Sequence, residues 1–119
     1  MSMEIVGNSG GILTARISGK LTQPELAALQ EFAVGVIRQQ GQIRILVIAE
    51  DFLGWDKSDE WSDISFMEND PYINKMAIVG EKKWEELALV FAAKGLRTFP
   101  IEYFQPADLD RARVWLTAE

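Results

Sequence analysis

Two short runs of aliphatic residues constrain the fold of this chain more than any other feature. Residues 43–49 and 76–79 are nearly continuous stretches of β-branched and other aliphatic side chains. Such runs are typical of strands that are covered on both faces of a sheet. Because neighbouring parallel strands need a crossover connection, the segments around these runs must supply helices that pack on the sheet.

Three segments carry helical signals. Thr22 and Glu25 form a capping pattern that predicts a helix start, and Gly41 predicts its end. A second helix is expected over residues 82–94, and a third is expected after Pro106. The side chains expected to face inward are Leu26, Leu29, Ala33, Val36 and Ile37 in the first helix, Trp84, Leu87, Ala88 and Phe91 in the second, and Leu109, Ala112, Trp115 and Leu116 in the third.

The order of the remaining elements places these helices between strands. Residues 3–6 and 11–18 predict a β-hairpin, and residues 96–104 predict a last strand that Pro100 marks as an edge strand. With one more helix expected between the two aliphatic runs, the order is β-β-α-β-α-β-α-β-α. We therefore predict one α/β domain over residues 1–119, built on a mixed, mostly parallel sheet.

Composition excludes several classes of protein. The net charge is −6 and the 12 Lys and Arg residues are scattered, which disfavours nucleic acid and anionic membranes as electrostatic partners. The sequence holds no cysteine and no histidine, which removes disulfides, thiolate zinc sites and the commonest acid–base group. Its longest apolar run is shorter than a membrane span, and its first residues lack a secretory pattern, so a cytoplasmic location is expected.

No enzymatic activity, cofactor or metal is predicted from these residues. Glu50 and Asp51 follow the central strand, where α/β sheets place ligands, but a solvated turn explains them more simply. Residues 56–67 resemble a calcium loop only loosely, because the glycine at the sixth place and the glutamate at the twelfth are missing.

The segment of residues 50–70 is the most unusual part of the chain. It holds eight carboxylates and a single lysine, together with large apolar side chains. These side chains are Phe52, Leu53 and Trp55, in an expected loop, Trp61, Ile64 and Met67, on one face of an expected helix, and Phe66. Leaving such side chains exposed forfeits about 1.5–3 kcal/mol each, so the domain's own core, a second subunit or an apolar ligand must cover them.

Several motifs in the chain resemble those of a known family. They are the turn of residues 50–55, the stretch of residues 73–80 that leads into Lys83 and Trp84, and the tail with Tyr103 and Phe104 followed by residues 112–116. In their order and spacing, the chain resembles the SpoIIAA-like family, whose fold is close to the STAS domain of anti-sigma-factor antagonists. The resemblance implies a mixed sheet with the helices packed largely on one face. It also implies a similarity to the CRAL-TRIO fold of carriers for apolar ligands.

The resemblance also directs attention to one serine. STAS regulators are phosphorylated on a serine in an Asp-Ser turn after the central strand. Here Phe52 follows Asp51 directly, and Ser58 comes several residues later. Ser58 is therefore the candidate phosphorylation site by resemblance, although its place before Asp59 and Glu60 is also typical of a helix N-cap.

Two functions follow from these predictions. The first is a non-enzymatic module that binds a small apolar or amphipathic ligand, such as a lipid, under a mobile lid helix near residues 59–69, with peripheral contact to a membrane. Its predicted ligand-binding side chains are Phe52, Trp55, Trp61, Ile64, Met67, Trp84 and Phe91. The alternative is a STAS-like regulatory module that binds another protein through the surface around residues 50–60. Self-association as a homodimer is also expected, because it would cover the same aromatic side chains.

Overall fold

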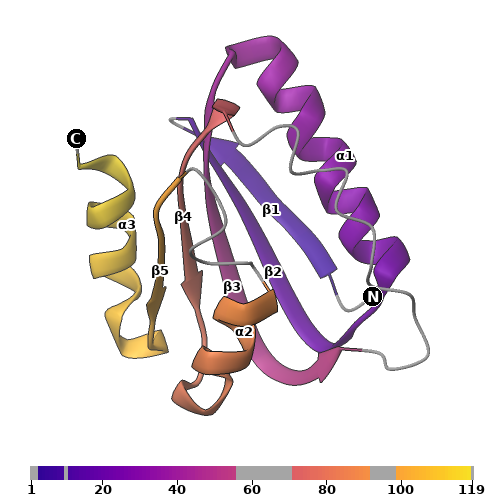
Figure 1. Ribbon diagram of the computed structural model, residues 1–119, viewed down its shortest axis with the longest axis vertical. Helices are drawn as coiled ribbons and strands as arrows, with labels where there is room; N and C mark the ends of the chain where they lie inside the picture. Colours follow the sequence, from indigo (N-terminus) through magenta and orange to yellow (C-terminus); the bar gives the residue numbers. More distant parts are fainter. Residues whose placement is uncertain (1–2, 10, 56–70, 92–98, 119) are drawn as a thin grey trace.

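The described residues form a five-stranded mixed sheet that carries three α-helices (Figure 1). The computed structural model describes residues 3–9, 11–55, 71–91 and 99–118. The elements are β1 (Met3–Ser9), β2 (Ile12–Leu21), α1 (Gln23–Gln40), β3 (Ile43–Trp55), β4 (Ile73–Val79), the 3₁₀-helix η2 (Lys82–Trp84), α2 (Glu85–Phe91), β5 (Ile101–Phe104), the 3₁₀-helix η3 (Pro106–Asp108) and α3 (Leu109–Thr117).

The strands lie in the order of the chain, from β1 to β5. Strand β1 runs antiparallel to β2, and all other neighbouring pairs are parallel. The carboxyl ends of the parallel strands therefore meet at one edge of the sheet, at the bottom of Figure 1. The predicted α/β class and the mixed, mostly parallel sheet are confirmed.

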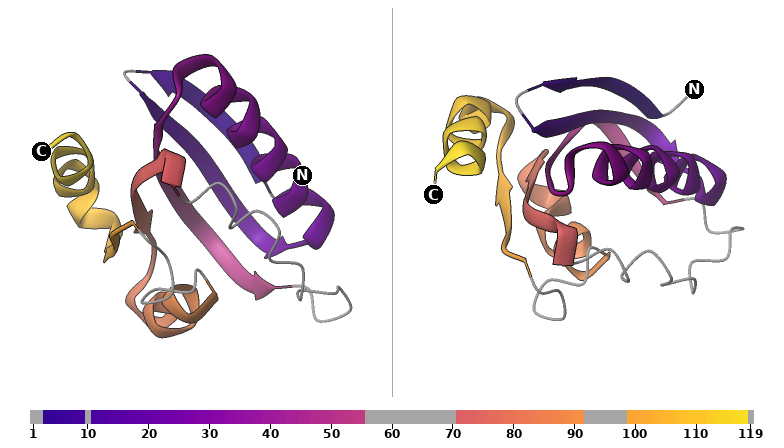
Figure 2. Two further views of the ribbon diagram at one scale, coloured as in Figure 1. Left: turned by 45° about the horizontal axis from the view of Figure 1, so that its top comes forward. Right: turned by 90° about the horizontal axis from the view of Figure 1, so that it is seen from above.

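The two faces of the sheet carry different helices, which lie on opposite sides of the strands (Figure 2). We call these two faces of the sheet the α1 face and the α3 face. Helices α1 and α2 pack on the α1 face, and α3 covers the other face over β3, β4 and β5. The helices thus pack largely on one face, as expected, with α3 as the exception.

Helix α1 is bounded as the sequence predicts. The Thr22 hydroxyl accepts a hydrogen bond from the Glu25 backbone N–H, and the Glu25 carboxylate accepts one from the Thr22 backbone N–H. Gly41, with a φ of 87°, donates its N–H to the Ile37 carbonyl and ends the helix. The buried residues of the helix are Leu29, Ala33, Val36 and Ile37.

Strand β3 is longer than predicted, and the expected turn over residues 50–55 was wrong. The strand continues to Trp55 and stays paired with β2, with Gly19 opposite Phe52. Its register shifts on both sides of Gly19, and Asp51 and Gly54 have φ values of 50° and 105°. These irregularities bend the strand without ending it, as β-bulges do. A strand that is bent in this way contains the same residue types as a turn, which is why residues 50–55 were predicted as a turn.

Helix α2 also departs from the predicted stripe. The segment begins with η2, so its first turn has three residues rather than 3.6, and this shifts the phase of the side chains. Leu87 is 54% exposed rather than buried, and Leu89 packs against the core in its place. Strand β5 lies at the edge of the sheet, as predicted. It begins only at Ile101, so Phe99 and Pro100 lie outside it, and residues 96–98 of the predicted strand lie outside the described residues.

Helix α3 packs on its face as predicted. Ala112 and Leu116 are fully buried, and Leu109 and Trp115 are partly buried against the same cluster. Among the described helices, none is both long enough and apolar enough to cross a membrane.

Candidate functional site

Three aromatic side chains of the α1 face, Phe52, Trp84 and Tyr103, lie at the carboxyl edge of the sheet. Phe52, at the end of β3, is 7% exposed and meets the Trp84 ring edge-on, with 5.1 Å between the ring centroids. The indole also lies against the β3 backbone, since a Cβ built on Gly54 would stand 3.4 Å from Trp84 Cη2. The structure thus brings together two of the predicted ligand-binding residues. It places Phe52 in the core rather than in a loop.

Tyr103 completes this end of the α1 face. Its hydroxyl donates a hydrogen bond of 2.6 Å to the backbone carbonyl of Glu81, which ties β5 to the segment that follows β4. The hydroxyl lies directly over Gly80, where an added Cβ would be 2.6 Å from the oxygen. Burial, and then the nearby carboxylates of Glu85 and Glu81, raise the pKa of Tyr103 to about 12.

Sequence reasoning did not single out Tyr103 as a site residue. The signal that could have found it is the glycine that directly follows an aliphatic strand. Gly80 directly follows β4, and the neighbouring strand β5 carries the polar aromatic residue Tyr103. A glycine at such a place marks a close approach by another group.

Several apolar side chains of the central strands are only partly buried on the α1 face. Val47 and Ala49 on β3 and Met76 on β4 pack against the core cluster without being enclosed by it. Trp84 and Tyr103 share this state at the carboxyl edge. Central strands of a covered sheet normally have fully buried side chains, so this group offers apolar surface for further contact.

The remaining predicted site residues lie outside the part of the chain that the structure describes. This holds for Ser58 and for the proposed lid over residues 59–69, with its Trp61, Ile64 and Met67. It also holds for the side chains of Trp55 and Phe91, whose backbones belong to β3 and α2. The lid and its contacts therefore stay predictions.

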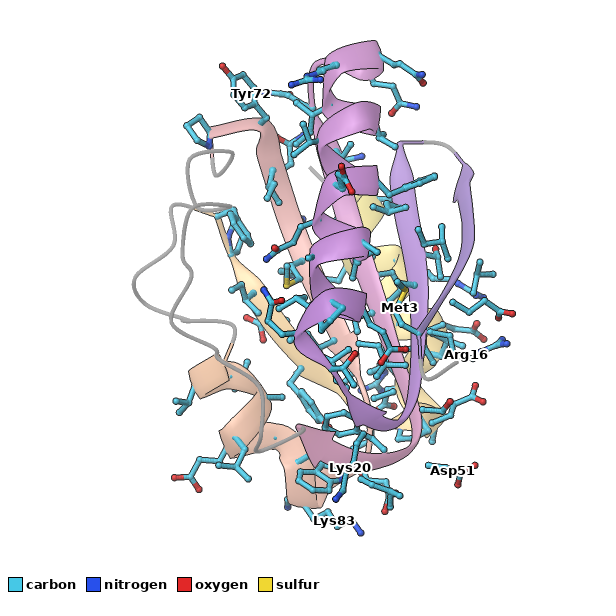
Figure 3. The ribbon with its side chains drawn as sticks, turned by 90° about the vertical axis from the view of Figure 1, so that its right-hand side faces the viewer. Met3, Arg16, Lys20, Asp51, Tyr72 and Lys83 are labelled. Atoms are coloured by element: carbon cyan, nitrogen blue, oxygen red, sulfur yellow. The ribbon has the colours of Figure 1, made fainter. Side chains whose placement is uncertain are left out.

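The carboxylates at the end of β3 face solvent. Arg16 lies 3.2 Å from Glu4 and 3.6 Å from Glu50, and all three side chains are well exposed. Arg16 and Asp51 point away from the body of the domain (Figure 3). Within the described ranges, no three acidic side chains gather as metal ligands do. These carboxylates form a solvated surface.

The fold is that of a small α/β module with a mixed five-stranded sheet among the described residues. A family model described as SpoIIAA-like matches residues 12–117, and the chain belongs to the SpoIIAA-like family. This membership indicates a regulatory or binding module, in a family that is generally non-enzymatic.

A solved structure supports the same fold. The chain is similar to the crystal structure of an uncharacterised protein of the DUF3478 family with a SpoIIAA-like fold from Shewanella loihica PV-4. The TM-score is 0.70 at 19% sequence identity, and the match covers 96% of this chain and 91% of that one. At this identity the likeness concerns the fold alone. A comparison with curated proteins found no match.

Proposed function

We propose that this domain is a non-enzymatic binding module for a small apolar or amphipathic ligand. The ligand would lie on the α1 face, over the carboxyl halves of β3, β4 and β5. The observation that carries the proposal is the partly buried group of Val47, Ala49 and Met76, which lies in the middle of the sheet and is flanked by Trp84 and Tyr103.

Apolar contact would supply the binding energy at this place. Each Å² of apolar surface removed from water contributes about 25 cal/mol, so a ligand that covers several of these side chains gains a few kcal/mol. The Tyr103 hydroxyl is protonated at neutral pH, as in an ordinary tyrosine, and its raised pKa of about 12 extends this state to alkaline pH. This hydroxyl is therefore uncharged, which suits a neutral or apolar part of the ligand.

The two helices on this face pack on different strands. Helix α1 packs over β1, β2 and β3, and α2 packs near β5. None of residues 85–90 is fully buried. We infer that α2 is the element that adjusts when a ligand binds, while α1 stays in place. The lid of residues 59–69, with Trp61, Ile64 and Met67, is part of the same proposal, as are Trp55 and Phe91.

Lipid extraction and native mass spectrometry of gently purified protein test the proposal directly. A co-purified apolar molecule, or binding of an apolar fluorescent probe at micromolar concentration, is the expected result. If neither is observed, the proposed function is wrong.

A matched pair of variants locates the site. Val47→Thr replaces a methyl group by a hydroxyl at nearly constant volume on the α1 face. Val6→Thr makes the same change on β1, at a side chain that is 50% exposed. We expect Val47→Thr to weaken probe binding by about threefold to tenfold, the effect of losing one buried methyl group. Val6→Thr should leave the affinity unchanged, and equal affinities for both variants would place the ligand elsewhere.

A regulatory module that binds another protein is the second candidate. The observation that favours it is Leu53, which is 65% exposed beside the exposed carboxylates Glu50 and Asp51. An apolar side chain within an acidic surface suits a basic protein partner.

A pull-down with two variants tests this candidate. Leu53→Asn should abolish a specific partner band that the wild type captures. Val114→Asn changes a side chain that is 67% exposed on α3 and should retain the band. The same band with Leu53→Asn would exclude this surface as the contact.

Two further measurements test the other proposed contacts. Light scattering tests the homodimer, and co-sedimentation with vesicles tests the membrane contact.

A further inference from the structure

Arg44 occupies an unusual position for a charged side chain. It lies near the start of β3 on the α3 face, two residues before the buried Leu46, and is itself partly buried. Its Nε atom is buried and has no hydrogen-bond partner. A buried donor without an acceptor costs about 1–3 kcal/mol, and more when the group is charged.

The residue beside Arg44 on the next strand is a second cation. Lys75 is its register partner on β4, and Lys75 Nζ donates hydrogen bonds of 2.8 Å to the carbonyls of Trp115 and Ala118. The same ammonium lies 4.9 Å from the centroid of the Trp115 ring. These contacts hold the Lys75 ammonium at the end of α3, while its backbone is paired with that of Arg44. Like charges on directly paired residues repel each other, so the arrangement is unfavourable without a counter-ion.

The described residues supply no counter-ion for this pair. No described carboxylate lies within 4.0 Å of Arg44 or Lys75. Arg16, on the neighbouring strand β2, shows the usual solution, because it is paired with both Glu4 and Glu50. The lack of a described carboxylate near Arg44 and Lys75 is the more unusual because the chain has more acidic than basic residues, with a net charge of −6.

We propose that Arg44 and Lys75 form a binding site for an oxyanion, either a carboxylate or a phosphate group, on the α3 face at the amino ends of β3 and β4. The planar guanidinium donates two parallel hydrogen bonds to such a group, and carboxylate or phosphate oxygens match that geometry. The oxyanion offsets the repulsion between the two cations. Partial burial limits the competition from water.

This site is separate from the proposed apolar-ligand site. It lies on the opposite face of the sheet and at the opposite ends of the parallel strands. Either proposal therefore stands or fails without the other.

Titration followed by NMR tests the site. Inorganic phosphate and acetate are added separately to the full chain, against chloride at matched ionic strength. We expect one or both oxyanions to shift the Arg44 Nε–H resonance and the backbone amides of Ile12 and Lys75, which are its register partners. Chloride should not cause these shifts. A response to phosphate alone identifies a phosphate site, and a response to acetate alone identifies a carboxylate site.

Two substitutions then test whether the response to the oxyanion depends on Arg44. Arg44→Gln should weaken oxyanion binding by about tenfold or more, the effect of losing a charged hydrogen-bond donor. Arg38→Gln removes the same charge from an exposed position in the last turn of α1 and should leave binding unchanged.

Three outcomes would overturn the proposal. They are equal shifts with chloride, unchanged affinity in Arg44→Gln, and equal losses in both glutamine variants. If circular dichroism shows that Arg44→Gln does not fold, Arg44→Lys takes its place, because it keeps the charge and removes the planar fork. Undiminished oxyanion binding by Arg44→Lys would then contradict the proposed geometry.

Discussion

The two helices on the α1 face are held to the sheet in different ways. Helix α1 has a complete capping box, a glycine at its end and four buried side chains. Helix α2 has seven residues, and two of its apolar side chains, Leu87 and Val90, are 54% and 73% exposed. Among the described residues, Leu89 packs against the core, and the neighbouring Trp84 and Tyr103 add a contact with Phe52 and a hydrogen bond to Glu81.

This difference agrees with the proposal that α1 belongs to the scaffold and that α2 adjusts. Local signals and burial both stabilise α1, so its position does not depend on one contact. The described attachments of α2 are fewer: Leu89 packs against the core, and Trp84 and Tyr103 contact the neighbouring segments. Elements that move on ligand binding are drawn from parts with few buried contacts. The comparison therefore supports a ligand site at the α2 end of the face.

The largest expected effect comes from removing the aromatic anchor of α2. Trp84→Ala should lower the free energy of unfolding by about 3 kcal/mol, because the change removes a large packed side chain and leaves a cavity. Chemical denaturation measures this loss. Hydrogen exchange should show α2 opening in the variant while α1 stays protected.

Trp115→Ala is the matched control for the anchor. Trp115 packs on the α3 face against Phe104. Its removal should loosen α3 and leave the exchange of α2 unchanged. If both variants open α2 equally, the distinction between α1 and α2 on the α1 face is wrong.

Gly80→Ala tests the second attachment. The new methyl group would lie 2.6 Å from the Tyr103 hydroxyl, which must give up its bond to Glu81 or shift. We expect a loss of about 2 kcal/mol in the free energy of unfolding, as for other overpacked sites.

A double-mutant cycle identifies the cause of that loss. In a Tyr103→Phe background the hydroxyl is absent, so Gly80→Ala should cost about 1 kcal/mol less than it does alone. Additive effects would show that the hydroxyl is not the group that the methyl displaces.

Thr22→Ala probes α1 and should have a smaller effect. It removes one side of the capping box and should cost about 1 kcal/mol in thermal or chemical unfolding. The loss should be spread over the whole domain, because α1 does not open separately. Thr117→Ala in the last turn of α3 is the control, since it removes a threonine hydroxyl that bonds only to exposed carbonyls of its own helix. An equally large loss of stability in Thr117→Ala would show that the capping hydroxyl of Thr22 has no special role.

A last effect, separate from these substitutions, is expected at alkaline pH. The pKa of Tyr103 is raised from 10.0 to about 12, so between these values the unfolded chain releases the proton that the folded chain keeps. The contribution of Tyr103 to stability is therefore fully present below pH 10 and is lost as the pH rises toward 12. Denaturation at increasing pH measures this decline. It should be shallower in Tyr103→Phe, and identical slopes in the two proteins would contradict the assignment.

Much of the fold could be predicted from local patterns. The capping box of α1, the alternation of β2 and the inward stripe of α3 depend on residues close together in the chain. Leu13, Ala15 and Ile17 are buried as their period of two predicts. The family match over residues 12–117 agrees with the predicted resemblance.

The candidate site could be predicted only in part. Phe52 and Trp84 were identified, but Phe52 was assigned to a loop, and Tyr103 was not included. A bent strand and a turn use the same residue types, so residues 50–55 did not distinguish them. The 3₁₀ turn before α2 changed which side chains face the sheet, and no local pattern signalled this change.

By itself, the sequence determined the class of fold, the limits of α1 and the inward face of α3, because these depend on the spacing of apolar residues and on caps within one segment. Only the tertiary structure decided that Phe52 meets Trp84, that Tyr103 lies over Gly80, and that Arg44 stands beside Lys75. Each of these pairs joins residues far apart in the chain. Strand register and the bends of β3 bring them together, and both are set by the packing of the whole sheet.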